Sequence, residues 1–370
     1  MLPVVGDENP FRGHLLSGKP PRGWARFREL FGNRGRQRRE RVETRLDEIL
    51  RSEKPDVVWF HNIAGGGKWG WSEAMIPIAR NHAPVLWTLH DMWALGSGGE
   101  SYWEISIGGK GKMGTGESVG KVGRRAGSKV EKVCGEKGKY PVRLTAPSKW
   151  LAELTHKITG AECDHLPNPI DLDFFSPGNP GKARRRLGLP EKGVVILAGA
   201  DSLKDPRKGF DLLIAAWDQL HPAGATLALF GRHGQAKPGL VYLGNLVSDG
   251  EMVAAYQAAD LYVHPARMEN APCMIQESLA CGTPVLAFPV GGISEMIIDE
   301  KSGFLAKECK IESLRATLTK VLMDPPVLGV MGNECWKQAH NIWDPNRLSQ
   351  RFSEILRGLS LSKEHSSSCK

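Results

Sequence analysis

The sequence lacks the long apolar runs and cysteine patterns that mark membrane-spanning, secreted or metal-binding proteins. No stretch of about 18 or more apolar residues occurs, so no transmembrane helix is predicted. Residues 1–24 contain no continuous apolar core of signal-peptide length, and we therefore expect a cytoplasmic protein. The seven cysteines are scattered, without a C-x-x-C pair. We expect reduced thiols and no metal site.

The sequence has fewer acidic than basic residues. Lys and Arg number 49 against 41 Asp and Glu, which gives a formal net charge of +8 and favours anionic partners. The basic residues concentrate in 22–54 and 108–139. Neither stretch has the interleaved aromatic residues that base stacking needs, so a nucleic-acid partner is not expected. Two interpretations stay open: a solvated surface, or contact with a charged acceptor or with anionic lipid, which would place the protein peripherally at the inner face of the plasma membrane.

Predicted strands and helices alternate along the chain in two runs. Apolar runs at 56–60 and 85–89 each end in a polar corner, and a second series of strands begins with VVILAGA at 194–200. Such alternation predicts parallel sheets covered by helices on both faces. A proline-marked joint near 167–177 separates the runs. The predicted fold class is therefore α/β, with two doubly wound, Rossmann-like domains that face a central cleft.

The same pattern predicts the domain boundaries. We expect one domain at 1–167, a second domain at 168–342, and a helix at 343–358 that packs back on the first domain. The serine-rich end, 359–370, is expected to be disordered. The Gly- and Lys-rich segment 96–139 is too long for an ordinary connection, and is either a mobile functional loop or a disordered insertion.

An acidic pair flanks a predicted helix start in RMENAPCMIQESLACGTPVLAFPVGG, residues 267–292. Pro272 suits the first helical turn and Gly282 suits its end, so a helix is predicted from about 272 to 281. Glu269 precedes this helix and Glu277 lies inside it. The two carboxylates are thus separated by a helix N-terminus.

A nucleotide sugar fits across this helix start. The amides of Cys273 and Met274, together with the helix dipole, favour a phosphate group. Glu277 lies roughly 6 Å further along the axis at 1.5 Å per residue, about the span from a diphosphate to its ribose. A carboxylate accepts hydrogen bonds from both ribose hydroxyls. Glu269 lies on the other side of the diphosphate, where the sugar is expected.

These residues resemble a known family. The E-x7-E spacing, followed by LACGTPVLAFPVGGISEMI, is similar to the retaining glycosyltransferases of family 4, which have the two-domain GT-B fold. PNPIDLDFF resembles their interdomain segment, and DPRKGFDLLIAAW resembles their donor-phosphate loop. VLWTLHDMWAL with TAPSKWLAEL resembles a subgroup involved in polysaccharide assembly. The similarity covers residues 56–343, and it implies that the domain at 1–167 binds the acceptor and the domain at 168–342 binds the nucleotide sugar.

The resemblance implies individual roles. Glu269 would contact the transferred sugar, Lys208 the diphosphate, and His90 the reacting sugar and acceptor, which makes these three the catalytic candidates. The implied donor-binding residues are Glu277, Arg207, Asn270, Ala271, Cys273, Met274, Gly291 and Gly292. Plainer interpretations stay open: solvated surface residues, a satisfied strand-end histidine, and for the two glycines a tight turn. His61, at the neighbouring strand end, is a weaker candidate.

The implied activity is a metal-independent, hexosyltransferase-like transfer. A sugar would pass from a nucleoside-diphosphate sugar to a hydroxyl of a sugar or lipid-linked acceptor, without a cofactor and with its configuration retained. The expected process is polysaccharide or glycolipid assembly.

Three departures from the family pattern keep other functions open. The usual first strand and glycine-rich turn are absent before Arg22, so the first unit is expected to be truncated or lost. Ala200 and Asp201 stand where the family often has an arginine. The related subgroup has a cysteine-rich segment after the strand that ends in HDMW, whereas this sequence has a Gly- and Lys-rich stretch there with one cysteine, Cys134. The alternatives are a degenerate, non-catalytic nucleotide-sugar-binding or scaffold protein, and a GT-B epimerase, for which no convincing acid/base set is found.

Overall fold

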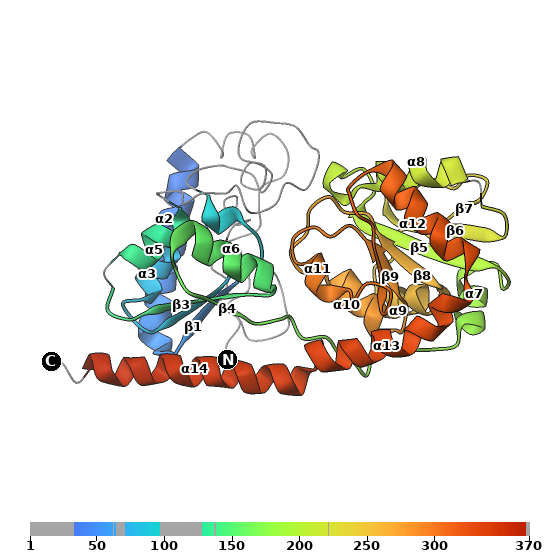
Figure 1. The fold of residues 1–370 in the computed structure, drawn as a ribbon. Helices are drawn as coiled ribbons and strands as arrows, with labels where there is room; N and C mark the ends of the chain where they lie inside the picture. Colours follow the sequence, from blue (N-terminus) through green and yellow to red (C-terminus); the bar gives the residue numbers. More distant parts are fainter. Residues whose placement is uncertain are drawn as a thin grey trace.

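The computed structural model describes residues 33–61, 63, 71–96, 128–136, 138–220 and 222–367. They form two α/β domains that lie side by side, with a long C-terminal helix along one side of the N-terminal domain (Figure 1). The expectations placed on residues 1–32, and on most of the segment 96–139, lie outside the described residues.

The N-terminal domain is built on a four-stranded parallel sheet with the order β1-β2-β3-β4. Its strands are β1 Val58–His61, β2 Val85–Thr88, β3 Val142–Ala146 and β4 Cys163–His165. Its helices are α2 Asn33–Glu53, α3 Met75–Ala79, η2 Trp93–Leu95, α5 Lys129–Gly135 and α6 Lys149–Thr159. The core includes one apolar stripe of α2, formed by Val42, Leu46, Ile49 and Leu50, because residues three or four apart share a helix face.

The C-terminal domain is built on a six-stranded parallel sheet with the order β10-β9-β8-β5-β6-β7. Its strands are β5 Val194–Ser202, β6 Ala225–Arg232, β7 Leu240–Tyr242, β8 Leu261–His264, β9 Val285–Ala287 and β10 Gly303–Leu305. Its helices are α7 Pro180–Leu187, η4 Pro206–Lys208, α8 Phe210–Leu220, α9 Asp249–Ala258, α10 Cys273–Ala280, α11 Ile293–Met296, α12 Ile311–Met323 and α13 Pro326–Trp343. The two parallel sheets confirm the predicted α/β class.

The strand order places a topological switch between β5 and β8. The chain runs from β5 to β6 on one side of the sheet, and β8 pairs with β5 on the other. In open parallel sheets, ligands bind beyond the carboxyl ends of the strands at such a point. The loops that follow β5 and β8 carry Lys208 and Glu269, so the switch brings them to the same edge of the sheet.

The C-terminal end of the chain returns to the N-terminal domain. The helix α14, Pro345–Ser367, follows α13 after a break at Asp344. Ile355 and Leu359 of α14 are buried with Leu86 and Leu166 of the N-terminal domain. Near the break, the amide of Ile170 donates to the carbonyl of Trp343 at 3.3 Å.

The expectation of a disordered tail at 359–370 is wrong for the part that the structure describes. The helix α14 continues to Ser367, and Leu359 is 3% exposed. The polar composition of this segment favoured disorder, but the apolar positions 355 and 359 lie on one helix face, which the N-terminal sheet covers. Among the described residues, none of the helices is long and apolar enough to cross a bilayer.

We expect the packing of α14 to be sensitive to truncation of its buried face. Leu359→Ala should lower the free energy of unfolding by about 2–3 kcal/mol, since it leaves a cavity between helix and sheet. Leu361→Ala, at a side chain that is 57% exposed, is the control, and should change it by less than about 0.5 kcal/mol. Urea denaturation measures both. Equal losses in the two variants would contradict the assigned packing.

Candidate active site at the domain boundary

A cavity of ≈ 350 Å³ opens between the two domains. Both domains contribute to its wall from loops at the carboxyl ends of their strands. The residues that line it are His90, Asp91, Trp93, Pro147, Asn168, Arg207, Lys208, Met268, Glu269, Asn270 and Ala271. The structure therefore brings together the three predicted catalytic residues, together with three of the predicted donor-binding residues.

The short helix η4 presents Lys208 to this cavity. The Asp205 carboxylate begins η4 by accepting from the Arg207 amide at 2.9 Å, and Gly209 ends it with φ +69°. A Cβ on Gly209 would lie 1.8 Å from the carbonyl oxygen of Pro265, so only glycine allows the two loops to meet. The Arg267 amide also donates to the Arg207 carbonyl at 2.8 Å. The loop after β5 is thereby fixed against the loop after β8.

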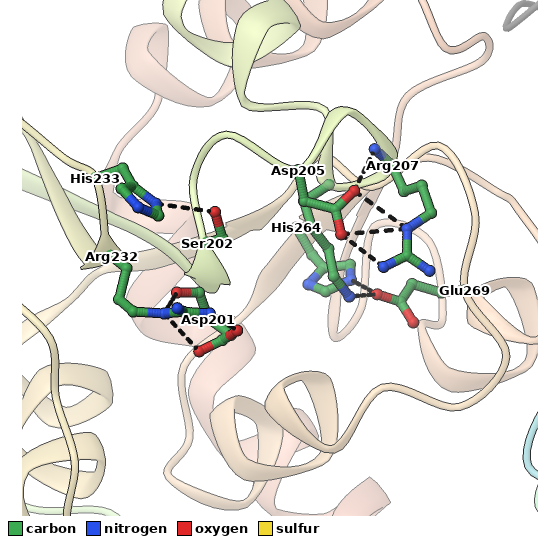
Figure 2. Close-up of polar contacts among 9 residues, drawn as sticks. Asp201, Ser202, Asp205, Arg207, Arg232, His233, His264 and Glu269 are labelled. Carbon is green, nitrogen blue, oxygen red and sulfur yellow. Dashed lines mark hydrogen bonds and ion pairs between the residues drawn. The ribbon is translucent and has the colours of Figure 1, made fainter. Parts of the chain in front are cut away.

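Two nitrogen atoms lie close to one carboxylate oxygen of Glu269. The Lys208 ammonium donates to Oε1. His264 Nε2 lies 3.4 Å from the same atom (Figure 2). The Glu269 side chain is only 15% exposed. Burial alone would raise its pKa, but the neighbouring His264 and Lys208 outweigh burial and lower the pKa to about 2. Glu269 is therefore ionised at neutral pH.

The carboxylate of Glu277 contacts a buried tyrosine. Its Oε2 accepts a hydrogen bond from the buried Tyr256 hydroxyl at 2.7 Å. Burial raises the pKa of Glu277, and the Tyr256 hydrogen bond opposes this effect without cancelling it. The two acids of the pair thus differ in their surroundings, because Glu269 lies beside the Lys208 ammonium and Glu277 beside a neutral hydroxyl.

The helix α10 begins at Cys273, and Pro272 is its N-cap. Among the described residues, no side chain caps its first amides. Partial burial of the Cys273 thiol, and then the charge of Glu277, raise its pKa. Glu277, Cys273, Met274, Gly291 and Gly292 do not line the cavity described above. Their roles toward a donor stay predictions.

On the N-terminal side, two histidines at neighbouring strand ends form a pair. His61 Nδ1 lies 2.8 Å from His90 Nε2. Burial, and then His90, lower the pKa of His61 to about 4. Burial also lowers the pKa of His90, although Asp91 opposes this. Both rings are therefore neutral at neutral pH, where one N–H can donate to the other ring.

Asp91 and Trp93 were not predicted as site residues. Asp91 Oδ1 accepts from the Trp93 amide at 2.8 Å, and the Lys129 ammonium lies 4.3 Å from the centre of the Trp93 ring. Asp91 directly follows His90 and Trp93 is three positions after it, so the polar corner at the strand end was the available signal. Its assignment to a cavity wall depends on the opposite domain, which the local sequence does not reveal.

Asn270 and Ser148 connect the domains beside the cavity. Asn270 Nδ2 donates to the His90 carbonyl at 2.9 Å, and Ser148 Oγ donates to Asn270 Oδ1 at 2.5 Å. Ser148 is also the N-cap of α6, where it accepts from the Leu151 amide at 3.0 Å. One serine therefore begins a helix in one domain and contacts the loop after β8 in the other.

Glu295 of α11 makes a second connection. Its two carboxylate oxygens accept from the amides of Lys149 and Trp150, at 2.8 and 2.5 Å. These amides are the first of α6, which lack partners within their own helix. A carboxylate there also interacts favourably with the helix dipole. The C-terminal domain thus caps a helix of the N-terminal domain.

The glycine pair lies within this interdomain contact. A Cβ on Gly291 would lie 1.8 Å from the Glu269 carbonyl oxygen, and one on Gly292 would lie 2.2 Å from that of Asn270 and 2.7 Å from Ser148 Cβ. Close packing against protein backbone is therefore enough to require glycine at both positions.

The ends of β5 and β6 show where the chain departs from the family pattern. Arg232 pairs with Asp201, with Nε 3.1 Å from Oδ1, and Arg207 pairs with Asp205, also at 3.1 Å between Nε and Oδ1 (Figure 2). Asp201 thus occupies the end of β5 as part of an exposed ion pair, while Arg207 reaches the cavity from η4.

The Glu295 contact predicts a domain effect. Glu295→Ala should increase the radius of gyration in small-angle X-ray scattering, because it leaves two α6 amides without their acceptor, at a cost of about 1 kcal/mol. Glu153→Ala, at an exposed position of the same helix, is the control and should leave the radius unchanged. An unchanged radius in both variants would show that Glu295 does not hold the domains together.

The match to a known protein family falls within the C-terminal domain. Residues 182–338 match the family model described as glycosyl transferases group 1. The chain is 32% identical over 187 residues to a D-inositol 3-phosphate glycosyltransferase of Segniliparus rotundus, covering 46% of this chain and 41% of that protein. It is 29% identical over 224 residues to a GDP-mannose-dependent alpha-(1-6)-phosphatidylinositol monomannoside mannosyltransferase of Mycolicibacterium smegmatis, covering 54% and 57%. The chain spans about half the length of the curated relatives it matches.

Solved structures match over both domains. Anabaena Alr3699/HepE in complex with UDP-glucose has a TM-score of 0.62 at 18% identity, covering 85% of this chain and 82% of that chain. Sucrose-phosphate synthase from Thermosynechococcus elongatus has a TM-score of 0.60 at 18% identity, covering 87% and 79%. At this identity the likeness concerns the fold, and it confirms the predicted GT-B architecture. Residues 182–338 are therefore a glycosyltransferase group 1 domain, set in a chain with the two-domain GT-B fold.

Proposed function

We propose that this protein transfers a sugar from a nucleoside-diphosphate sugar to an acceptor hydroxyl, with the anomeric configuration retained. The observation that carries the proposal is the shared cavity, where Lys208 and Glu269 of the group 1 domain face His90 of the N-terminal domain. Cations on one wall and neutral or anionic hydrogen-bonding groups on the other suit a donor with an anionic leaving group and an uncharged sugar.

The donor diphosphate would bind on the C-terminal side. Lys208 and Arg207 line the cavity, and the α10 amides lie on the same polypeptide segment as Glu269. These groups supply positive charge and N–H donors where the departing diphosphate accumulates negative charge. A relative named as GDP-mannose-dependent and a structural neighbour in complex with UDP-glucose support this donor class. The two names differ in their base, so the base preference stays open.

The reaction breaks the bond between the anomeric carbon and the diphosphate oxygen and forms one to the acceptor oxygen on the same face of the sugar. The acceptor proton passes to an oxygen of the departing diphosphate, so the site needs no protein nucleophile. Ionised Glu269 would accept from sugar hydroxyls and stabilise the positive charge that develops on the ring. Neutral His90 would accept a hydrogen bond from the reacting sugar or acceptor, with its ring held by His61.

The acceptor would enter from the N-terminal side, beside Asp91 and Trp93. The names of the relatives include an inositol phosphate and a phosphatidylinositol mannoside, which supports a polyol or glycolipid hydroxyl as acceptor. A lipid-linked acceptor would fit peripheral contact between a basic protein and an anionic membrane. Contact between the domains beside the cavity would exclude water, which otherwise competes with the acceptor.

Two substitutions test the assigned residues. Lys208→Ala should lower kcat about 10²- to 10³-fold, because the diphosphate loses its cation in the transition state. Glu277→Ala should nearly abolish transfer through loss of the ribose contact. Lys204→Ala, an exposed lysine in the same loop, is the control. Rates near those of the unmodified protein in either test variant would remove that residue from the mechanism.

A donor panel tests the function itself. UDP-, GDP- and ADP-sugars are screened for binding by thermal shift, and for hydrolysis or transfer by product analysis. An enzyme releases nucleoside diphosphate from one of them, and its product keeps the anomeric configuration of the donor. Thermal stabilisation without turnover would instead support a non-catalytic nucleotide-sugar-binding protein, which the carboxylate Asp201 at the end of β5 makes a specific alternative.

A further inference from the structure

Two cationic side chains of the cavity wall are carried by a very short element. Arg207 and Lys208 belong to η4, a single turn of three residues, Pro206–Lys208. A turn this short makes few hydrogen bonds of its own, so its carbonyl groups need partners from elsewhere in the chain. The place of both cations in the cavity therefore depends on what binds those carbonyls.

Arg267, in the loop after β8, supplies these partners. Its Nη1 donates to the Pro206 carbonyl at 2.7 Å, and its amide donates to the Arg207 carbonyl at 2.8 Å. Two consecutive carbonyls of η4 are thus bound by one residue, once through its side chain and once through its backbone. The Gly209 amide also approaches the Pro206 carbonyl, at 3.4 Å, so Arg267 makes the shorter bond.

The same guanidinium joins η4 to the helix that follows it. Nη1 and Nη2 of Arg267 donate to Oδ1 and Oδ2 of Asp211, at 2.7 and 2.6 Å, in the first turn of α8. The hydrogen bonds from Arg267 lower the pKa of Asp211, so its carboxylate is charged at neutral pH. Because the guanidinium is planar and the pair is bidentate, it fixes direction as well as distance. The Pro206 carbonyl and the start of α8 are therefore held in one orientation.

Arg267 does not line the cavity itself. Its side chain is 12% exposed, and the part of its loop that lines the cavity is 268–271. Its guanidinium is used on the Pro206 carbonyl and on Asp211. Two positions later in the same loop, the Glu269 carboxylate contacts the ammonium of η4. Arg267 therefore acts on the cavity through the placement of η4, and not by contact with a ligand.

We propose that Arg267 is a positioning residue for the donor diphosphate, because its guanidinium holds η4 where Lys208 and Arg207 meet the phosphates. This inference rests on the proposed function, and adds to it the residue that aligns the phosphate-binding cations. A hydrogen bond to a charged group depends on distance and direction, so a displaced η4 binds phosphate more weakly. The nucleoside part of the donor, which η4 is not proposed to contact, is bound as before.

The test variant is Arg267→Gln, which lacks the charged fork but keeps the backbone bond to Arg207. Isothermal titration calorimetry gives the Kd of UDP, GDP and ADP, and the matching nucleosides are titrated in competition with them. We expect the Kd of the diphosphate that binds to rise about tenfold, because its charge-assisted bonds lose their alignment. The Kd of the matching nucleoside should change by less than about twofold, which a general loss of structure would not allow.

The matched control is Arg232→Gln. Arg232 forms an arginine–aspartate pair with Asp201 at the neighbouring strand ends, and 54% of its side chain is exposed. The substitution removes the same charge and leaves an exposed aspartate unpaired, as Arg267→Gln does. Among the described residues, the hydrogen bonds of Arg232 go to Asp201 and not to η4. We expect its diphosphate Kd to change by less than about twofold. A loss equal to that of Arg267→Gln overturns the proposal, since local charge would explain both.

The remaining outcomes separate this inference from the proposed function. An unchanged diphosphate Kd in Arg267→Gln overturns the positioning role alone, as does an equal rise for diphosphate and nucleoside. Should Arg267→Gln fail to fold, Arg267→Lys keeps the charge but replaces the fork by one ammonium, and a selective rise of about threefold is expected. An unchanged diphosphate Kd in that variant also overturns the role. Failure of UDP, GDP and ADP to bind the unmodified protein overturns the proposed function, and this inference with it.

Discussion

The candidate site depends on keeping one buried carboxylate ionised. Glu269 has a pKa of about 2 although burial opposes its charge. The loop after β5 brings Lys208 to this carboxylate, and the end of β8 brings His264. The contact of Gly209 with Pro265 allows that meeting, because no side chain fits between the loops. A packing requirement at a glycine thus sets the electrostatics of a glutamate that is distant in sequence.

The second requirement is a contact between domains that stays reversible. Asn270 reaches the His90 carbonyl across 180 residues of sequence, and Glu295 reaches the amides that begin α6. Hydrogen bonds of this kind are each worth about 1 kcal/mol, so the contact is specific without being permanent. The same loops carry Glu269 and His90 into the cavity. The contact between the domains and the wall of the cavity therefore share the loops that carry Asn270 and His90.

Features that depend on neighbouring residues could be predicted from the sequence. The predicted helix at 272–281 differs from the observed Cys273–Ala280 by one residue at each end, since Pro272 and Gly282 mark its limits. The alternation of apolar strands and amphipathic helices predicted both parallel sheets. Lys208, Glu269 and His90 could be placed because each follows a strand whose carboxyl end faces the boundary.

Features that depend on contacts between distant segments could not be predicted in the same way. Gly291 and Gly292 pack on the backbone of the 269–270 loop and on Ser148, which a tight turn in sequence does not reveal. The pairing of His264 with Glu269 leaves no sequence pattern, because its geometry comes from the end of β8. The length of α14 depends on contacts with the N-terminal domain, where Leu86 and Leu166 cover the apolar face of a segment that its polar composition alone would leave disordered.

The course of α14 restricts how the two domains can move. The chain crosses between them twice, near Ile170 and near Asp344, and the hydrogen bond from the Ile170 amide to the Trp343 carbonyl joins the two crossings. The helix α13 belongs to one domain, whereas the buried face of α14 belongs to the other. The break between them coincides with the joint, so the two crossings in the described part of the chain lie together. A rotation of the domains centred on this joint would change the width of the cavity between Lys208 and His90.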